Sequence, residues 1–236
     1  MESISDKNLD QLCYRIQQII NTSSMKLPEE YFYSSLSFCL TDAIFSMSVR
    51  YQSVRKVIKN LSSAINVPIS KYVNSKPYTL LNFADFMSNY NDKDLAEIVF
   101  QNRQRTSSTN GILKASAVRI ACDILIEHGI TDFTHINEKS VGKIEGDFCK
   151  IKGQKSGISF KYFCMLAGDE NLVKPDRMVC RFIQNSIALP KTPTPSQAED
   201  YFFAAYKRLK HEYIDLTPRI LDYFIWDFQR GIKNVG

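Results

Sequence analysis

Apolar side chains recur at intervals of three and four residues along most of the chain, which is the spacing of one face of an α-helix. In residues 31–61 this pattern predicts one long helix or a broken pair, with its apolar face formed by Leu36, Leu40, Ile44, Met47 and Tyr51. The same spacing returns in residues 112–128, where Gly129 follows as a stop signal.

Three further helical runs lie in the second half of the chain. The segment SGISFKYFCMLAG ends in Gly168, a residue type that often terminates helices. After a proline-rich linker, Ser196 and Glu199 have the spacing of a capping box and predict a helix start. Thr217 followed by Pro218 predicts the start of a last amphipathic helix. The sequence shows no sustained alternation of apolar and polar residues, so the expected fold class is all-α.

The composition is that of an ordinary globular protein, with 44% hydrophobic and 23% charged residues. The sequence holds no apolar run of membrane-spanning length, and its first twenty residues lack the apolar region of a signal peptide. These features predict a cytoplasmic protein without a membrane partner. The net charge of +5 is compatible with a polyanionic partner.

The cysteines and histidines indicate neither a metal nor a redox site. The six cysteines contain no C-x-x-C pair, and the three histidines lack the spacing of metal ligands. In a cytosolic protein, scattered cysteines of this kind are most simply buried thiols. We therefore expect no metal site and no cofactor.

A glycine-containing turn between two helical segments is the first candidate for chemistry. It reads IKGQKSG, between a short helix predicted in residues 138–149 and a helix beginning near Ile158. Such a turn can present backbone N–H groups at the start of the second helix, where they and the helix dipole suit a phosphate oxygen. Lys152 and Lys155 add positive charge for the same partner. A glycine turn between helices can equally be only a connection.

The loop QNRQRTSSTNGILK is polar and basic, with Arg103, Arg105 and Lys114. It is either a solvated connection between helices or a second contact with a nucleic-acid backbone.

Two segments together resemble a known family. The first is Ile151–Ser159, and the second is VKPDRMVCR, which contains Asp176. The chain resembles the helix-hairpin-helix DNA glycosylases, the superfamily that includes endonuclease III, the mismatch adenine glycosylase and the alkyladenine glycosylases. In that family the hairpin reads roughly L-P-G-V-G-x-[KQ]-[TS]-A, and a V-x-x-D-x-H-V-x-R segment with the essential aspartate follows.

The resemblance implies an all-α fold of two helical subdomains that flank a DNA-binding cleft with a helix-hairpin-helix motif. The implied subdomains are residues 32–167 and residues 1–31 plus 168–236. Asp176 takes the catalytic position, and Tyr51 is a candidate for the base pocket. Double-stranded DNA is the implied partner of a monomer, and the implied contacts with DNA are made by Lys152, Gly153, Gln154, Lys155, Ser156, Gly157, Ser159, Ser46, Ser48, Arg103 and Arg105.

Three departures from the family pattern refine this expectation. Lys155 replaces the second hairpin glycine, Met178 replaces the histidine after the aspartate, and no cluster of four cysteines follows. Bifunctional members carry a nucleophilic lysine late in the hairpin, where this chain has Gly157. The resemblance therefore implies a monofunctional DNA glycosylase without an iron–sulfur cluster, which leaves an abasic site.

Asp176 has a chemical role open to it and a structural one. Breaking an N-glycosidic bond leaves positive charge on the sugar, which a carboxylate stabilises while it activates water. An aspartate after a proline at a helix start is also an ordinary N-cap. Two alternatives to an enzyme therefore stay open: a non-catalytic helix-hairpin-helix DNA-binding protein, and a helical scaffold for a protein partner. The glycosylase would serve either genome repair or defence against phage DNA that carries modified bases.

Overall fold

A computed structural model of the chain describes residues 4–47, 49–136 and 138–232. These residues form helices joined by loops, and the β-bridges among them are isolated pairs, Tyr33 with Ser70 and Arg105 with Leu113. The fold class is therefore all-α, as the three- and four-residue periodicity predicts. Two compact units divide the chain: a terminal unit of Met1–Leu27 with Asp169–Gly236, and a central unit of Pro28–Gly168.

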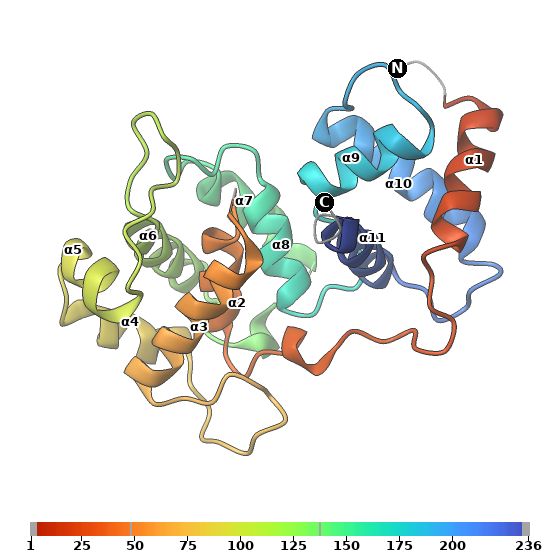
Figure 1. Ribbon diagram of the computed structural model, residues 1–236. Coiled ribbons are helices and arrows are strands. Elements are labelled where there is room, and N and C mark those ends of the chain that lie inside the picture. Colours follow the sequence, from red (N-terminus) through yellow and green to blue (C-terminus); the bar gives the residue numbers. More distant parts are fainter. Residues whose placement is uncertain (1–3, 48, 137, 233–236) are drawn as a thin grey trace. The chain divides into compact units, whose positions relative to one another are not determined.

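The central unit is built around a helix that is buried on every side. Helix α2 (Leu36–Phe45) packs against α3 (Tyr51–Ile65), α6 (Lys114–Glu127) and α8 (Ile158–Leu166) (Figure 1). All ten residues of α2 are buried, which is the property of a central helix rather than a surface helix. The single periodic run of residues 31–61 is thus a broken pair, α2 and α3.

Shorter elements complete the central unit around this helix. These are η1 (Glu29–Tyr31), α4 (Leu80–Ser88), α5 (Asp92–Asp94), the π-helical turn η2 (Leu95–Val99), η3 (Phe133–His135) and α7 (Glu138–Phe148). Helix α4 packs on α6, while α7 packs on both α6 and α8. The C-termini of α6 and α7 are joined through His128, whose Nε2 lies 2.9 Å from Oδ2 of Asp147.

The terminal unit is a bundle of α1 (Asp6–Gln17), α9 (Arg177–Ser186), α10 (Pro195–Leu209) and α11 (Pro218–Ile232). Its core draws on all four helices and includes Leu12, Phe182, Phe202 and Leu221. Arg208 joins α10 to α1, because its guanidinium contacts the carboxylates of Asp6 and Asp10.

The helix caps confirm one sequence-based start and correct another. Thr217 Oγ1 accepts a hydrogen bond from the Ile220 N–H at 3.2 Å, so α11 begins where Thr217-Pro218 predicts. The predicted cap at Ser196 is wrong, because α10 begins two residues earlier with Thr194 and Gln197 as its capping box. Pro195 explains the shift, since its fixed φ and missing N–H suit the first helical position.

Candidate phosphate-binding turn and carboxylate site

The segment between α7 and α8 is a tight turn that depends on two glycines. Gly153 and Gly157 have φ values of +85° and +69°, in the left-handed region that favours glycine. Gly157 is the N-cap of α8 and offers no side chain to the first N–H groups of that helix. Lys152 and Lys155 are exposed beside it. The turn thus places two cations next to a helix N-terminus that carries partial positive charge.

Two residues that were expected to contact DNA are instead buried and stabilise the turn through a hydrogen bond with each other. Gln154 and Ser159 are each 1% exposed, and the Ser159 hydroxyl donates a hydrogen bond to Gln154 Oε1. Ser156 is exposed, and its Oγ accepts a long hydrogen bond of 3.5 Å from the Ile158 N–H. Of the polar side chains in the turn, the lysines and Ser156 therefore face solvent, whereas Gln154 and Ser159 fix the backbone.

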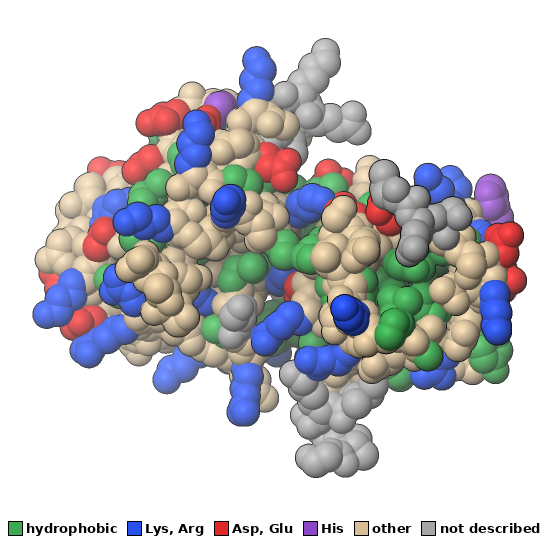
Figure 2. Space-filling model, turned by 90° about the horizontal axis from the view of Figure 1, so that it is seen from above, with side chains coloured by type: hydrophobic (Ala, Val, Ile, Leu, Met, Phe, Trp, Pro, Cys, Tyr) green, Lys and Arg blue, Asp and Glu red, His purple; other side chains and the backbone are tan. Residues whose placement is uncertain are grey.

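The basic loop of residues 101–111 lies directly against this turn. A Cβ placed on Gly153 would stand 2.5 Å from the Cβ of Thr106, which shows how closely the two segments approach. Arg103 and Arg105 are exposed on this loop; Arg103 pairs with Glu97 at 3.1 Å, and Arg105 Nε donates to the Gly111 carbonyl oxygen at 2.8 Å. Figure 2 shows several Lys and Arg side chains along the lower edge of the larger unit, which lies on the left.

Lys114 does not belong to this basic surface, contrary to the pattern of its loop. Its side chain is 2% exposed, and its ammonium donates to the carbonyl oxygens of Phe45 at 2.9 Å and Met47 at 2.8 Å. These carbonyl groups lie at the C-terminal end of α2, where the helix dipole favours a cation. Lys114 is therefore a structural cap.

The polar residues after α2 have different outcomes. Ser46 is the C-cap of α2, and its hydroxyl donates to the Ala43 carbonyl oxygen at 3.2 Å. Ser48, the other expected DNA contact in this segment, lies outside the described residues.

Tyr51, the expected pocket residue, belongs to a cluster around a buried carboxylate. Asp42 is 0% exposed and accepts a hydrogen bond of 2.7 Å from the Tyr33 hydroxyl. The ring of Tyr51 stacks on Tyr31 with 6.3 Å between the centroids. Burial, followed by the nearby charge of Asp42, raises the pKa of both Tyr33 and Tyr51. Both hydroxyls therefore keep their protons at neutral pH and act as neutral hydrogen-bonding groups.

In the terminal unit, Asp176 is the N-cap of α9. Its Oδ1 accepts a hydrogen bond of 2.7 Å from the Met178 N–H, and its backbone is extended at φ −87°. The side chain is partly exposed. Asp176 therefore has the capping role that the sequence left open, and that bond also fixes the direction of its carboxylate.

A second carboxyl group, which the sequence pattern did not single out, lies near Asp176. Asp222 of α11 is 9% exposed, and its Oδ1 accepts a hydrogen bond of 3.2 Å from the Lys174 N–H. Burial, followed by the negative charge of Asp176, raises the pKa of Asp222 to about 8. Asp222 therefore holds its proton at neutral pH. The sequence held one signal that could have identified this buried acid: Asp222 follows Leu221, which lies on the apolar side of the last helix.

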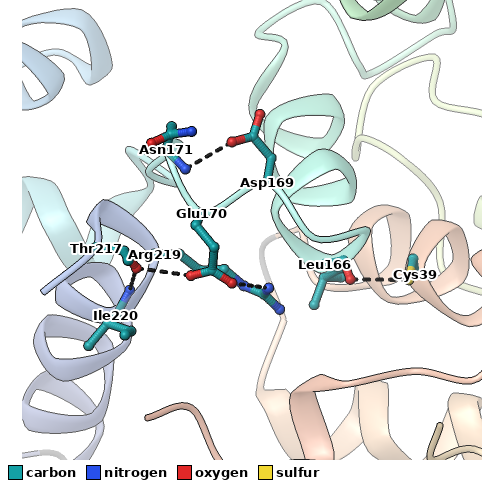
Figure 3. A network of polar contacts seen from close by, with 8 residues as sticks. All are labelled: Cys39, Leu166, Asp169, Glu170, Asn171, Thr217, Arg219 and Ile220. Carbon is teal, nitrogen blue, oxygen red and sulfur yellow. Dashed lines mark hydrogen bonds and ion pairs between the residues drawn. The ribbon is translucent and has the colours of Figure 1, made fainter. Parts of the chain in front are cut away.

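A polar network fastens the chain before Asp176 to the start of α11 (Figure 3). Glu170 accepts hydrogen bonds from the Thr217 hydroxyl and from Arg219 Nη1, each at 2.9 Å. The side chain of Arg219 is only 5% exposed, so this ion pair is partly shielded from water.

The structure thus groups the expected site residues by unit. The exposed lysines of the turn and the arginines of the loop lie in the central unit, whereas Asp176 lies in the terminal unit, which also holds the unexpected Asp222. A hollow of about 310 Å³ in the terminal unit is lined by other residues, among them Gln18, Tyr223 and Phe228.

The cysteine and histidine positions carry no metal cluster within the described ranges. No three His, Cys, Asp or Glu side chains gather there in a way that could hold a metal ion. All six cysteines are thiols, five of them buried and Cys149 partly exposed. None of the helices in the described part of the chain is both long and apolar enough to cross a membrane.

Comparison with known proteins identifies a family. The family model described as a domain of unknown function, DUF8548, matches residues 7–230, so the chain belongs to that family. Searches of curated proteins and of solved structures gave no match.

Proposed function

We propose that this member of the DUF8548 family is a monofunctional DNA glycosylase. It hydrolyses the N-glycosidic bond of a damaged or modified base that is flipped out of double-stranded DNA, and it leaves an abasic site. The observation that carries the proposal is the order of two features along the chain. A glycine turn with exposed Lys152 and Lys155 opens α8, and the loop after α8 leads to Asp176 at the start of α9.

The central unit would bind the DNA backbone. Phosphate oxygens suit the N-terminus of α8, which has a glycine cap, and the ammonium groups of Lys152 and Lys155 beside it. Arg103 and Arg105 lie on the loop that packs against the same turn, so they extend this basic surface. Contacts of this kind position a protein on DNA without reading its sequence.

Asp176 would carry the chemistry. As the N-glycosidic bond breaks, its electron pair leaves with the base, and positive charge develops on the deoxyribose. An ionised Asp176 stabilises that charge and accepts a proton from the water whose oxygen bonds to C1′. The departing base takes up a proton at its nitrogen, so the products are a free base and an abasic sugar in an intact strand.

Water, rather than a lysine, would be the nucleophile. A bifunctional mechanism needs an amine in the position that Gly157 occupies in the turn. The mechanism needs no cofactor. The biological setting is either genome repair or defence against phage DNA with modified bases.

The direct test is release of free base, measured by mass spectrometry. The purified protein is incubated with undamaged, alkylated, oxidised and deaminated DNA, and with phage DNA that carries hydroxymethylated or glucosylated cytosine. We expect one base to be released by the wild type and none by Asp176→Asn. Asparagine is also a good N-cap, so this variant removes the charge and retains the cap.

The matched control is Asp132→Asn in the central unit. Asp132 Oδ1 accepts a hydrogen bond of 2.9 Å from the Thr134 N–H, so it caps the N–H two residues later, as Asp176 does. This control should release base at the wild-type rate. DNA binding that weakens with salt, without base release from any substrate, would instead identify a non-catalytic DNA-binding protein in which Asp176 is only a cap.

A further inference from the structure

The turn that carries Asp176 is held by one face of α11 at two points. Closer to the start of α11, the guanidinium of Arg219 pairs with the Glu170 carboxylate. The backbone N–H of Arg219 also donates to the Glu170 carbonyl oxygen at 3.2 Å. Three residues further along α11, Asp222 accepts the Lys174 N–H. Arg219 and Asp222 are three residues apart and therefore lie on the same face of α11, so that one face holds both ends of the segment from Glu170 to Lys174. Asp176 follows two residues after the second point.

Asp222 is costly to keep at that position in its charged form. It is nearly buried, and the charged groups that face it are Asp176 from the start of α9, Lys174 from the turn, and Arg219 from its own helix. Arg219 is already paired with Glu170. A hydrophobic residue at this site would leave the Lys174 N–H without its acceptor. The turn therefore needs the oxygen of the Asp222 carboxyl group, and it does not need a negative charge there.

We propose that Asp222 is a positioning residue for Asp176: by accepting the Lys174 N–H it holds the Lys174–Asp176 turn against α11. This role rests on the proposed function, because it matters only if Asp176 needs a fixed, ionised carboxylate. The raised pKa of Asp222 supports it: at neutral pH the buried Asp222 keeps its proton, so it acts through its hydrogen bond rather than through a charge. Asp222 then anchors the turn, and Asp176 keeps the chemical role of the proposed function.

Alkaline pH should disturb the pair of acids. When Asp222 ionises, a second negative charge appears beside Asp176 and repels it, while the burial of that charge strains the turn. The wild-type rate of base release should therefore fall above about pH 8, where Asp222 loses its proton. An asparagine in place of Asp222 accepts the Lys174 N–H through its amide oxygen and does not ionise.

The first experiment does not depend on activity. The carboxyl carbons of aspartate are labelled with ¹³C, and the resonance of Asp222, assigned by its loss in Asp222→Asn, is followed by NMR as the pH changes. We expect the resonance to titrate near pH 8 in the wild type and at lower pH in Asp176→Asn, because the charge of Asp176 is removed. Titration in the ordinary acid range, or no response to Asp176→Asn, would overturn the inference whether or not any base is released.

The second experiment uses single-turnover base release across the pH range. We expect Asp222→Asn to keep the wild-type rate near neutral pH and to lose the alkaline decline. Asp222→Ala should be slower by roughly ten- to a hundredfold at every pH, since a small misplacement of a reacting group has an effect of this size. The matched control is Asp227→Asn on the same helix, whose carboxylate pairs with Arg230 at 2.7 Å.

The outcomes separate this inference from the proposed function. If the wild type and Asp222→Asn have the same pH profile, Asp222 does not act on Asp176, although the enzyme is a glycosylase. If the wild type releases no base while the NMR titrations behave as expected, the glycosylase proposal fails, and Asp222 is then a structural partner of the turn without a catalytic role.

Discussion

Gly153 lies so close to Thr106 that a Cβ on residue 153 would approach the Thr106 Cβ to 2.5 Å and the Thr106 carbonyl oxygen to 3.0 Å. The contact joins the turn before α8 to the basic loop of residues 101–111. Two segments that are separated by α6 and α7 in the sequence therefore share one local surface, and a small change at Gly153 affects both.

Replacing Gly153 with alanine should destabilise the central unit and weaken DNA binding. The added methyl group has no room beside Thr106, and the φ of +85° disfavours any side chain. We expect a loss of about 1–3 kcal/mol in the free energy of unfolding, measured by denaturant titration. Gly146→Ala is the control: a Cβ there meets no atom within 4 Å, and alanine inside α7 should raise stability by about 0.5–1 kcal/mol.

Reversing the charge of Lys152 and Lys155 should weaken DNA binding in a salt-dependent way. Each lost phosphate contact reduces the slope of log affinity against log salt by about one, so the double glutamate variant should lose about two. Fluorescence anisotropy with a labelled duplex at several salt concentrations gives this slope. The same reversal at Lys207 and Lys210, exposed residues at the end of α10, makes an equal change in net charge. An equal loss of affinity in that control would show that only the net charge matters.

Lys114→Met should destabilise the protein although the residue lies in a polar, basic segment of the sequence. The substitution leaves the carbonyl groups of Phe45 and Met47 without the ammonium that bonds to them. Hydrogen bonds to a charged group contribute about 1.5–3 kcal/mol, so a loss of about that size is expected. Thermal unfolding provides the measurement, with the exposed Lys93→Met as the near-neutral comparison. Equal melting temperatures for the two variants would contradict the capping role.

The stability of the terminal unit should decrease as the pH rises from acidic to mildly alkaline values, because Asp222 loses its proton. Its pKa in the folded state is about 8, above the ordinary value of 3.8, so the folded state binds its proton more tightly than the unfolded state. The stability from this group is therefore fully present below about pH 4 and is lost progressively as the pH rises towards 8.

Asp222→Asn removes this dependence, so its advantage over the wild type should grow with pH and reach a few kcal/mol near pH 8. The fluorescence of Trp226, the single tryptophan of the chain, reports on unfolding of the terminal unit, because it lies on α11. A wild type and a variant whose stabilities change in parallel with pH would show that Asp222 titrates normally.

The elements could be predicted largely from local signals. Periodicity identified α2, α3, α6, α8 and α11, and the segment with Gly153 and Gly157 was expected as a turn because glycine occupies left-handed backbone at little cost. The local signal was insufficient to predict the start of α10, where two residues were possible N-caps. Ser196 and Thr194 both precede a suitable partner three residues later, and the proline between them decided for Thr194.

The functions of individual side chains were much harder to predict. Lys114 and Gln154 are polar residues in polar segments, and Ser159 opens an apolar helix. All three are buried because their hydrogen-bond partners lie elsewhere: the carbonyl group of Phe45 for Lys114, and each other's side chains for Gln154 and Ser159. Asp222 was hidden in the same way within an apolar helical face. A sequence pattern gives the period of a helix, but the partner of a polar group on that helix comes from another segment.

The sequence by itself determined the helical class, the turn with its two lysines and the aspartate that opens α9. These depend on backbone preferences and on neighbours within one helical turn. Only the tertiary structure decided which cations face solvent and which acid keeps its proton. Exposure and pKa depend on the dielectric environment and on charges brought together from distant segments, as at Asp222, where α11 and the turn after Val173 meet.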